Sequence, residues 1–148
     1  MKKLFLILCA IFTLLIGSSF VTAASMNGFV LDDALIPEEE IFSGGPPKDG
    51  IPSLDRPEFV KAVQATFLRD EDRVLALKRN GIAKAYPLRI LNWHEIVNDT
   101  VGDKDLAITF CPLCGSAIVF EREVDGEILD FGVSGFLNES NLLMYSRE

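Results

Sequence analysis

Histidine and cysteine are scarce in this sequence of 148 residues. His94 is the single histidine, and of the three cysteines Cys9 lies in an apolar N-terminal run while Cys111 and Cys114 form a Cys-x-x-Cys pair. A zinc ribbon needs a second pair of cysteines, so the sequence excludes that fold. A serine hydrolase is not indicated either, because the residues around Ser134 break the glycine spacing of a nucleophile elbow and no second histidine could serve as its base.

Basic residues are also few. Lysine and arginine number 14 against 22 aspartates and glutamates, which gives a formal net charge of −8. This balance argues against nucleic acid and against an anionic membrane surface as partners, because both bind through clustered positive charge. It is compatible with cationic ligands such as metal ions. We predict no nucleotide cofactor, and the sequence does not indicate which protein partners the chain has.

The N-terminal segment has the pattern of a secretory signal peptide. Two lysines precede the apolar run of residues 4–16, and small residues at 22–24 suit a signal peptidase. A membrane anchor is the alternative, but the Gly-Ser-Ser break at residues 17–19 favours cleavage. We therefore predict a signal peptide over residues 1–24, an extracytoplasmic location (periplasm or secreted) and no stable membrane span after cleavage.

The rest of the chain is predicted to hold an irregular lead-in over residues 25–52, rich in Gly and Pro, and a single α+β domain over residues 53–148. Hydrophobic residues make up 49% of the chain, enough for a packed core. An amphipathic helix is predicted over residues 56–68, since Asp55 suits an N-cap, Glu58 completes a capping box and apolar residues recur at four-residue spacing. Those apolar residues are Phe59, Val63 and Phe67.

Hairpins dominate the remainder of the predicted domain. Strands over residues 74–78 and 82–86 flank an Asn-Gly dipeptide, the strongest short signal for a two-residue turn. An Asp-Gly dipeptide at residues 125–126 is predicted to turn the chain in the same way, with Phe120 facing Phe131 across the pair. Further strands are predicted over residues 106–110, 117–124 and 141–145.

A short, buried helix is predicted to begin at Pro87, because the residues that follow are almost wholly apolar. The acidic residues Asp99, Asp103 and Asp105 surround a turn and are predicted to be solvated. The predicted fold class is therefore α+β, an antiparallel hairpin-rich sheet with one amphipathic helix and one short buried helix.

The Cys-x-x-Cys pair is the sharpest chemical signal. Its two-residue spacing lets the sulfurs of Cys111 and Cys114 point the same way from one turn, which suits a disulfide or two ligands on one metal. A thioredoxin-type centre places its first cysteine at a helix N-terminus, whereas residues 117–120 have the pattern of a strand. A soft-metal site, a structural disulfide in a non-catalytic envelope module and a redox centre on a non-thioredoxin fold all stay open.

His94 precedes the pair by enough chain to fold back against the two thiols. Two thiolates and one imidazole match Cu(I), or Zn²⁺ with one open position. The leading hypothesis is therefore an exported protein that binds copper or zinc through Cys111, Cys114 and His94, with no catalytic residue assigned. The residues predicted to support this site are Glu95, Asn92 and, as a soft fourth ligand or a core residue, Met144.

Four sequence blocks resemble a known family. They are YPLRILNWHEIVND at residues 86–99, FCPLC at 110–114, FGVSG at 131–135 and NLLMY at 141–145. Together they are similar to the prokaryotic family catalogued as domain of unknown function thirty-one seventy-nine, from about Ile51 to the last residue. The resemblance implies an exported protein with no assigned activity. Family members usually continue through a further block containing Trp and Gln, so it also implies that the domain is C-terminally incomplete.

Overall fold

The computed structural model describes residues 25–32 and 34–148, and the predicted signal peptide lies outside them. Its central sheet has four strands in the order β4-β7-β8-β9. The strands are β4 (Leu54–Asp55), β7 (Ile96–Val101), β8 (Lys104–Cys111) and β9 (Ser116–Glu121). β4 runs parallel to β7 and the other neighbours are antiparallel.

A second sheet has three strands in the order β13-β12-β3, and three hairpins complete the β structure. The sheet contains β3 (Phe42–Ser43), β12 (Phe131–Asn138) and β13 (Asn141–Ser146). The hairpins pair β1 (Ser25–Met26) with β2 (Phe29–Val30), β5 (Val74–Arg79) with β6 (Ile82–Pro87), and β10 (Glu123–Val124) with β11 (Glu127–Ile128).

In residues 25–32 and 34–148, helical structure is limited to short turns. They are the 3₁₀ turns η1 (Glu38–Glu40) and η2 (Ala62–Gln64) and the α-helix α2 (Leu88–Leu91). Among the described residues, none of these helices has the length and apolar character needed to cross a membrane.

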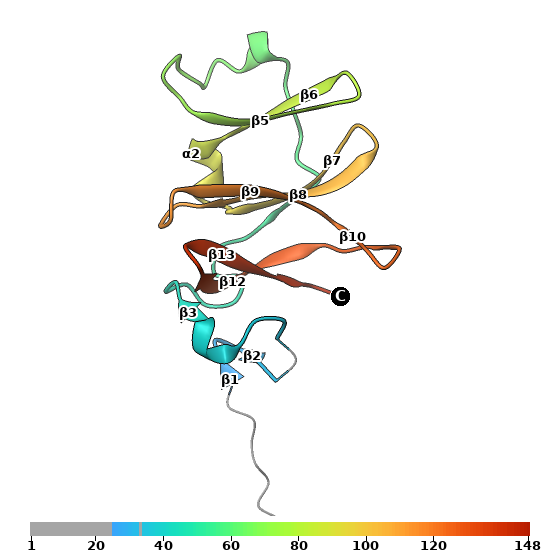
Figure 1. Ribbon diagram of the computed structural model, residues 1–148. Helices are drawn as coiled ribbons and strands as arrows, with labels where there is room; N and C mark the ends of the chain where they lie inside the picture. Colours follow the sequence, from blue (N-terminus) through green and yellow to red (C-terminus); the bar gives the residue numbers. More distant parts are fainter. Residues whose placement is uncertain (1–24, 33) are drawn as a thin grey trace, which may run out of the picture.

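The layers are stacked, with the central sheet between the β5–β6 hairpin and the β12–β13 sheet (Figure 1). Side chains alternate along a strand, so each face of the central sheet contributes to a different core. On one face Val97 and Val101 of β7 pack with Tyr86 and Leu91. On the other face Ile96 packs with residues of β8, β12 and β13, namely Cys111, Val133 and Leu142.

A buried asparagine joins the two sheets. Asn98 in β7 is 1% exposed, and its amide nitrogen donates to the Phe131 carbonyl and to Asp55 Oδ1, each at 2.8 Å. Its amide oxygen accepts the Phe131 backbone N–H at 3.0 Å. One side chain therefore satisfies both backbone groups of the first residue of β12, as a paired strand would.

The predicted amphipathic helix over residues 56–68 is wrong. Asp55 belongs to β4 and pairs with Asn98 of β7, and its carboxylate accepts hydrogen bonds from Asn98 and Arg147 instead of capping a helix. The next residue, Arg56, donates its N–H to the Asn98 carbonyl at 2.8 Å and has a φ of 49°, outside the helical range. The Asp55 side chain is thus engaged away from an N-cap role, and the left-handed φ of Arg56 prevents a helix from starting there.

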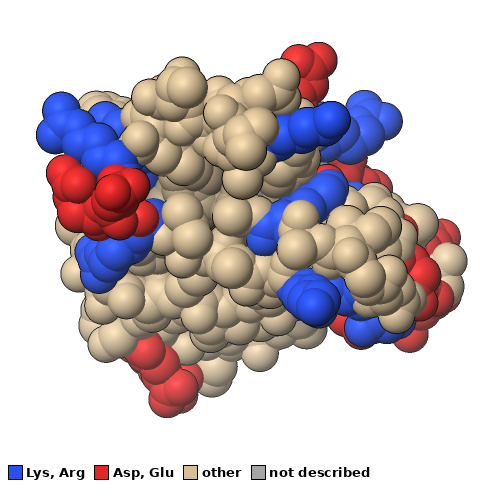
Figure 2. Space-filling view, turned by 90° about the horizontal axis from the view of Figure 1, so that it is seen from above, with Lys and Arg blue, Asp and Glu red and all other residues tan. Residues whose placement is uncertain are grey.

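Without the helix, the apolar residues of this segment stay largely at the surface. Phe59 contacts the Tyr86 ring edge-on at a centroid distance of 5.5 Å, and Lys84 lies over the Phe59 ring. Val63 and Phe67 are 86% and 52% exposed. A groove of about 690 Å³ separates the segment from β6 and α2. Figure 2 views this end of the molecule, where much of the middle of the face is neither acidic nor basic.

Unlike the predicted helix, the two predicted hairpin turns are confirmed. The hairpin around Asn80 and Gly81 is confirmed, with positive φ at both residues as a type I′ turn requires. The Asp125-Gly126 turn is confirmed too, and so is the strand over residues 141–145. The facing of Phe120 and Phe131 is wrong, because β9 pairs with β8 and Phe120 faces Ala107. A short helix does follow Pro87, although Leu91 is its one buried residue.

The fold class is consequently corrected from α+β to mostly β. Within the described part of the chain the one α-helix spans four residues, and strands are the predominant regular structure. The α+β prediction rested on the segment of residues 56–68, whose helical period was present in the sequence but whose first residue, Arg56, bonds to β7 and has a left-handed φ.

Replacing Asn98 by Ala should destabilise the protein by about 3 kcal/mol, because a buried side chain is lost and the N–H and carbonyl of half-buried Phe131 lose their partner. Chemical unfolding of the purified protein measures this. The matched control is Asn138→Ala, which removes one exposed hydrogen bond to the Glu40 carbonyl and should cost less than about 1 kcal/mol. Equal losses in the two variants would contradict a joining role for Asn98.

Candidate functional site

The Cys-x-x-Cys segment is the turn between β8 and β9. Cys111 is the last residue of β8 and pairs with Ser116, the first residue of β9. The turn closes through a hydrogen bond of 2.8 Å from the Gly115 N–H to the Cys111 carbonyl, and Gly115 has a φ of 67°. A side chain at that position would be strained, so the glycine sets the shape of the turn.

Both cysteines are free thiols, and they differ in access to solvent. Cys111 is 1% exposed and belongs to the core between the sheets, whereas Cys114 is half-buried and packs against that core. The Cys114 N–H donates to Cys111 Sγ at 3.2 Å. Burial raises the pKa of Cys111 to about 11, and the neighbouring Cys114 and Glu95 side chains act in the same direction.

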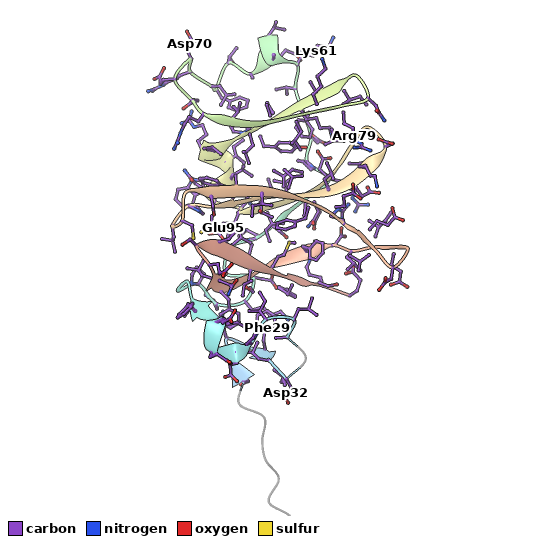
Figure 3. The ribbon with its side chains drawn as sticks, viewed as in Figure 1. Phe29, Asp32, Lys61, Asp70, Arg79 and Glu95 are labelled. Atoms are coloured by element: carbon purple, nitrogen blue, oxygen red, sulfur yellow. The ribbon has the colours of Figure 1, made fainter. Side chains whose placement is uncertain are left out.

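Glu95 stands at the start of β7, next to this thiol. Its backbone is held at both ends: its N–H donates to the Leu91 carbonyl and its carbonyl accepts the Phe110 N–H, each at 2.8 Å. Its φ of 55° is left-handed, which is uncommon for a residue other than glycine. Burial raises the pKa of the Glu95 carboxyl. In Figure 3 Glu95 lies at the level where the central sheet faces β13.

Cys111 and Glu95 line one pocket of about 230 Å³ between the two sheets. Asn92 also lines it, and the rest of the wall is apolar or glycine. These other lining residues are Gly44, Pro46, Ile51, Pro112, Leu113, Gly135, Phe136 and Leu137. The pocket therefore offers a thiol and a carboxyl in a largely apolar surrounding.

Gly135 allows the lead-in segment to pack closely against β12 beside this pocket. It lies in an irregular stretch of β12 between Val133 and Phe136, with a φ of 77°. A Cβ at this position would collide with the Pro46 carbonyl, so the lead-in segment crosses β12 where no side chain is present. Gly44 is held there by a hydrogen bond of 2.8 Å from its N–H to the Gly135 carbonyl.

His94 is anchored elsewhere. Its Nδ1 lies 2.8 Å from the Pro52 carbonyl oxygen, which makes Nδ1 the protonated nitrogen because a carbonyl only accepts. Within residues 25–32 and 34–148, no group of three or more His, Cys, Asp or Glu side chains is placed to hold a metal ion. The ligand set Cys111, Cys114 and His94 is thus not assembled here, and copper or zinc binding stays a prediction.

The supporting residues divide between the pocket and the core. Asn92 and Glu95 line the pocket, whereas Met144 packs against the core cluster that contains Cys111 and Cys114. The sequence predicted a role for Glu95 beside His94 and did not indicate that Glu95 lies beside Cys111. The hydrogen bond between Glu95 and Phe110, next to the cysteine, makes that connection, and it depends on how β7 pairs with β8.

Two polar residues have structural roles. Asp99, predicted to be solvated, is 5% exposed and forms an ion pair with Lys84 at 2.7 Å and accepts a hydrogen bond from the Tyr86 hydroxyl at 2.8 Å. Alternation along β7 is the signal that could have placed it inside, since it shares a face with Val97 and Val101. The Ser134 hydroxyl donates to the Leu143 carbonyl at 2.6 Å across the irregular part of β12.

Comparison with known proteins identifies the family. Residues 48–148 match the family described as "Protein of unknown function (DUF3179)". The chain belongs to this family. No curated protein and no solved structure matches it. The resemblance carried by the sequence blocks is therefore confirmed.

Relative to the wild type, the Glu95→Gln variant of this DUF3179 protein should gain stability as the pH rises from acid to neutral. A carboxyl whose pKa is raised by folding ionises first in the unfolded chain. The wild type therefore loses stability as the pH rises from the ordinary glutamate pKa, about 4.3, through the raised value. Melting temperatures of both proteins between about pH 4 and about pH 7 measure the difference.

Glu139→Gln is the matched control, because Glu139 is exposed and also has a left-handed φ, 44°. Its difference from the wild type should stay constant over the same range. A constant difference for Glu95→Gln as well would show that burial does not hold the Glu95 carboxyl neutral.

Proposed function

We propose that this protein is an exported thiol–disulfide redox protein whose Cys111 and Cys114 cycle between dithiol and disulfide. The observation that carries the proposal is the joint position of the two thiols in one closed turn, with the Cys114 N–H bonded to Cys111 Sγ at 3.2 Å. Two cysteines held in one turn form and break a disulfide bond with each other without rearrangement of the strands on either side.

The unequal exposure of the two thiols supports a redox role over a purely structural disulfide. Half-buried Cys114 lies beside Leu113, which is 72% exposed, so an external disulfide has a route to this turn. Labile disulfides are the exposed ones, whereas structural bridges are protected. The Glu95 carboxyl in the adjoining pocket adds a group that exchanges protons beside Cys111.

Export is supported by the basic, apolar and small-residue pattern of residues 1–24. An extracytoplasmic compartment supplies disulfides and keeps them oxidised, which gives a dithiol protein its substrates there. The centre lies at the end of a β-strand, so the helix dipole that activates thioredoxin-type cysteines has no counterpart at Cys111.

The Cys111–Cys114 couple should have a reduction potential between about −270 and −120 mV, the range of thiol–disulfide oxidoreductases. Equilibration of the Cys9→Ser protein in thiol buffers of set potential, followed by mass spectrometry of the trapped forms, measures it. A value below about −300 mV would identify a structural disulfide and contradict the proposal. Cys114→Ser, which has one thiol of the pair, is the control and should form no intramolecular bond.

Binding of a soft metal ion is a second candidate function, favoured by one specific observation. Met144 packs against the same core cluster as Cys111 and Cys114, so a thioether and two thiols share one region. Sulfur ligands of this kind select Cu(I). This set differs from the sequence-based one in containing Met144 in place of His94.

Competition between the reduced protein and a Cu(I) chelator tests this candidate. One Cu(I) per chain should bind, either cysteine-to-serine variant should abolish binding, and Met144→Leu should weaken it about tenfold because leucine keeps the volume and removes the sulfur. Met26→Leu, outside that cluster, is the matched control. Weakening by His94→Ala with no effect of Met144→Leu would restore the sequence-based ligand set, and no binding at all would exclude both.

A further inference from the structure

We infer that Cys114, the second cysteine of the pair, is the thiol that attacks the substrate disulfide, and that Cys111 is the thiol that resolves the mixed disulfide. This inference rests on the proposed function and deepens it by assigning each sulfur its step. The substrate class is a disulfide outside this chain, in another protein or a peptide.

The two sulfurs differ first in access. Cys111 closes strand β8, where its backbone pairs with Ser116, and its side chain lies between the two sheets with Ile96, Val133 and Leu142. Although Cys111 lines the pocket of about 230 Å³, only 1% of the residue is exposed, so an external disulfide has far less access to its sulfur than to that of half-buried Cys114. Cys114 lies on the turn itself and is half-buried.

The surroundings of Cys114 suit an incoming polypeptide. Pro112 and Leu113 precede it and are exposed, the latter to 72%. Residues 112–117 carry no charged side chain, so a substrate meets an uncharged, partly apolar turn. Contact of this kind favours a disulfide with apolar neighbours over one carried by a strongly charged molecule.

The hydrogen bond within the turn prepares the second step. The Cys114 N–H holds Cys111 Sγ at 3.2 Å from its nitrogen, so the buried sulfur lies against the residue that would carry the mixed disulfide. Cys111 therefore has one nearby electrophile, the Cys114 sulfur, and its attack needs no exposure of the core.

The proposed reaction consists of two successive thiol–disulfide exchanges. Cys114, as thiolate, attacks one sulfur of the substrate RS–SR′; a Cys114–SR bond forms, the S–S bond of the substrate breaks, and R′S⁻ leaves and takes up the proton that Cys114 released. Cys111 then loses its proton and attacks the Cys114 sulfur. The Cys111–Cys114 bond forms, RS⁻ leaves and is protonated, and two protein thiols have reduced one disulfide to two thiols.

Reaction of the reduced full chain with excess dipyridyl disulfide tests the order, in a Cys9→Ser background so that two thiols are counted. The wild-type pair should release two equivalents of thiopyridone. Cys111→Ser should release one equivalent at the wild-type initial rate and keep a stable mixed disulfide on Cys114. Cys114→Ser should react at least tenfold more slowly, because its remaining thiol is buried.

Denaturant provides the control for intrinsic reactivity. In denaturant the two serine variants should react at the same rate, so that any difference in the folded state comes from the structure. Fast reaction of folded Cys114→Ser together with slow reaction of Cys111→Ser would overturn the inference and make Cys111 the attacking thiol.

A second measurement does not depend on the folding of the variants. Brief alkylation of the native reduced protein with iodoacetamide, followed by peptide mass spectrometry, should label Cys114 before Cys111, and the opposite order would contradict the inference. The product of the wild-type reaction separates this failure from that of the proposed function. Two mixed disulfides with no Cys111–Cys114 bond would refute redox cycling itself, whichever thiol reacts first.

Discussion

The bond network of Asn98 holds the two sheets at a set distance and register, and the candidate pocket lies between those sheets. A strand normally satisfies its backbone groups with another strand, but the first residue of β12, Phe131, has both of its groups bound by this one side chain. The same amide reaches Asp55, so β4, β7 and β12 meet at one buried point. A buried amide with all its partners present rigidifies a core, and it is costly when one partner is missing.

Asp99, the next residue of β7, joins a third layer to the opposite face of the central sheet. Asp99 binds Lys84 and the Tyr86 hydroxyl, which attaches the β5–β6 hairpin to β7. Because successive side chains of a strand point to opposite faces, two adjacent polar residues anchor two different layers. The apolar residues around them are common to many β proteins, whereas these polar contacts define which surfaces meet.

This arrangement explains the asymmetry of the candidate site. Cys111, at the end of β8, lies in the core between the two sheets that Asn98 joins. Cys114, on the turn that follows, packs against that core from outside it. Glu95 enters the same pocket from the start of β7, where a left-handed residue redirects the chain after α2. The site therefore combines a buried sulfur, a second sulfur with access to solvent and a carboxyl, each supplied by a different part of the consecutive strands β7, β8 and β9 and their flanking residues.

The sequence alone determined the features that depend on a few adjacent residues. Asn80-Gly81 and Asp125-Gly126 form the predicted turns because a positive φ is a property of those dipeptides, and the Cys-x-x-Cys spacing implies one turn in any fold. The tertiary structure decided what depends on pairing. Residues 56–68 have the apolar period of a helix, yet Asp55 pairs with Asn98 of β7 and Arg56 has a left-handed φ, so no helix begins there. Likewise, no local pattern shows that Glu95 shares a pocket with Cys111 while His94 binds Pro52, since both partnerships join segments that are distant in sequence and adjacent only in the folded chain.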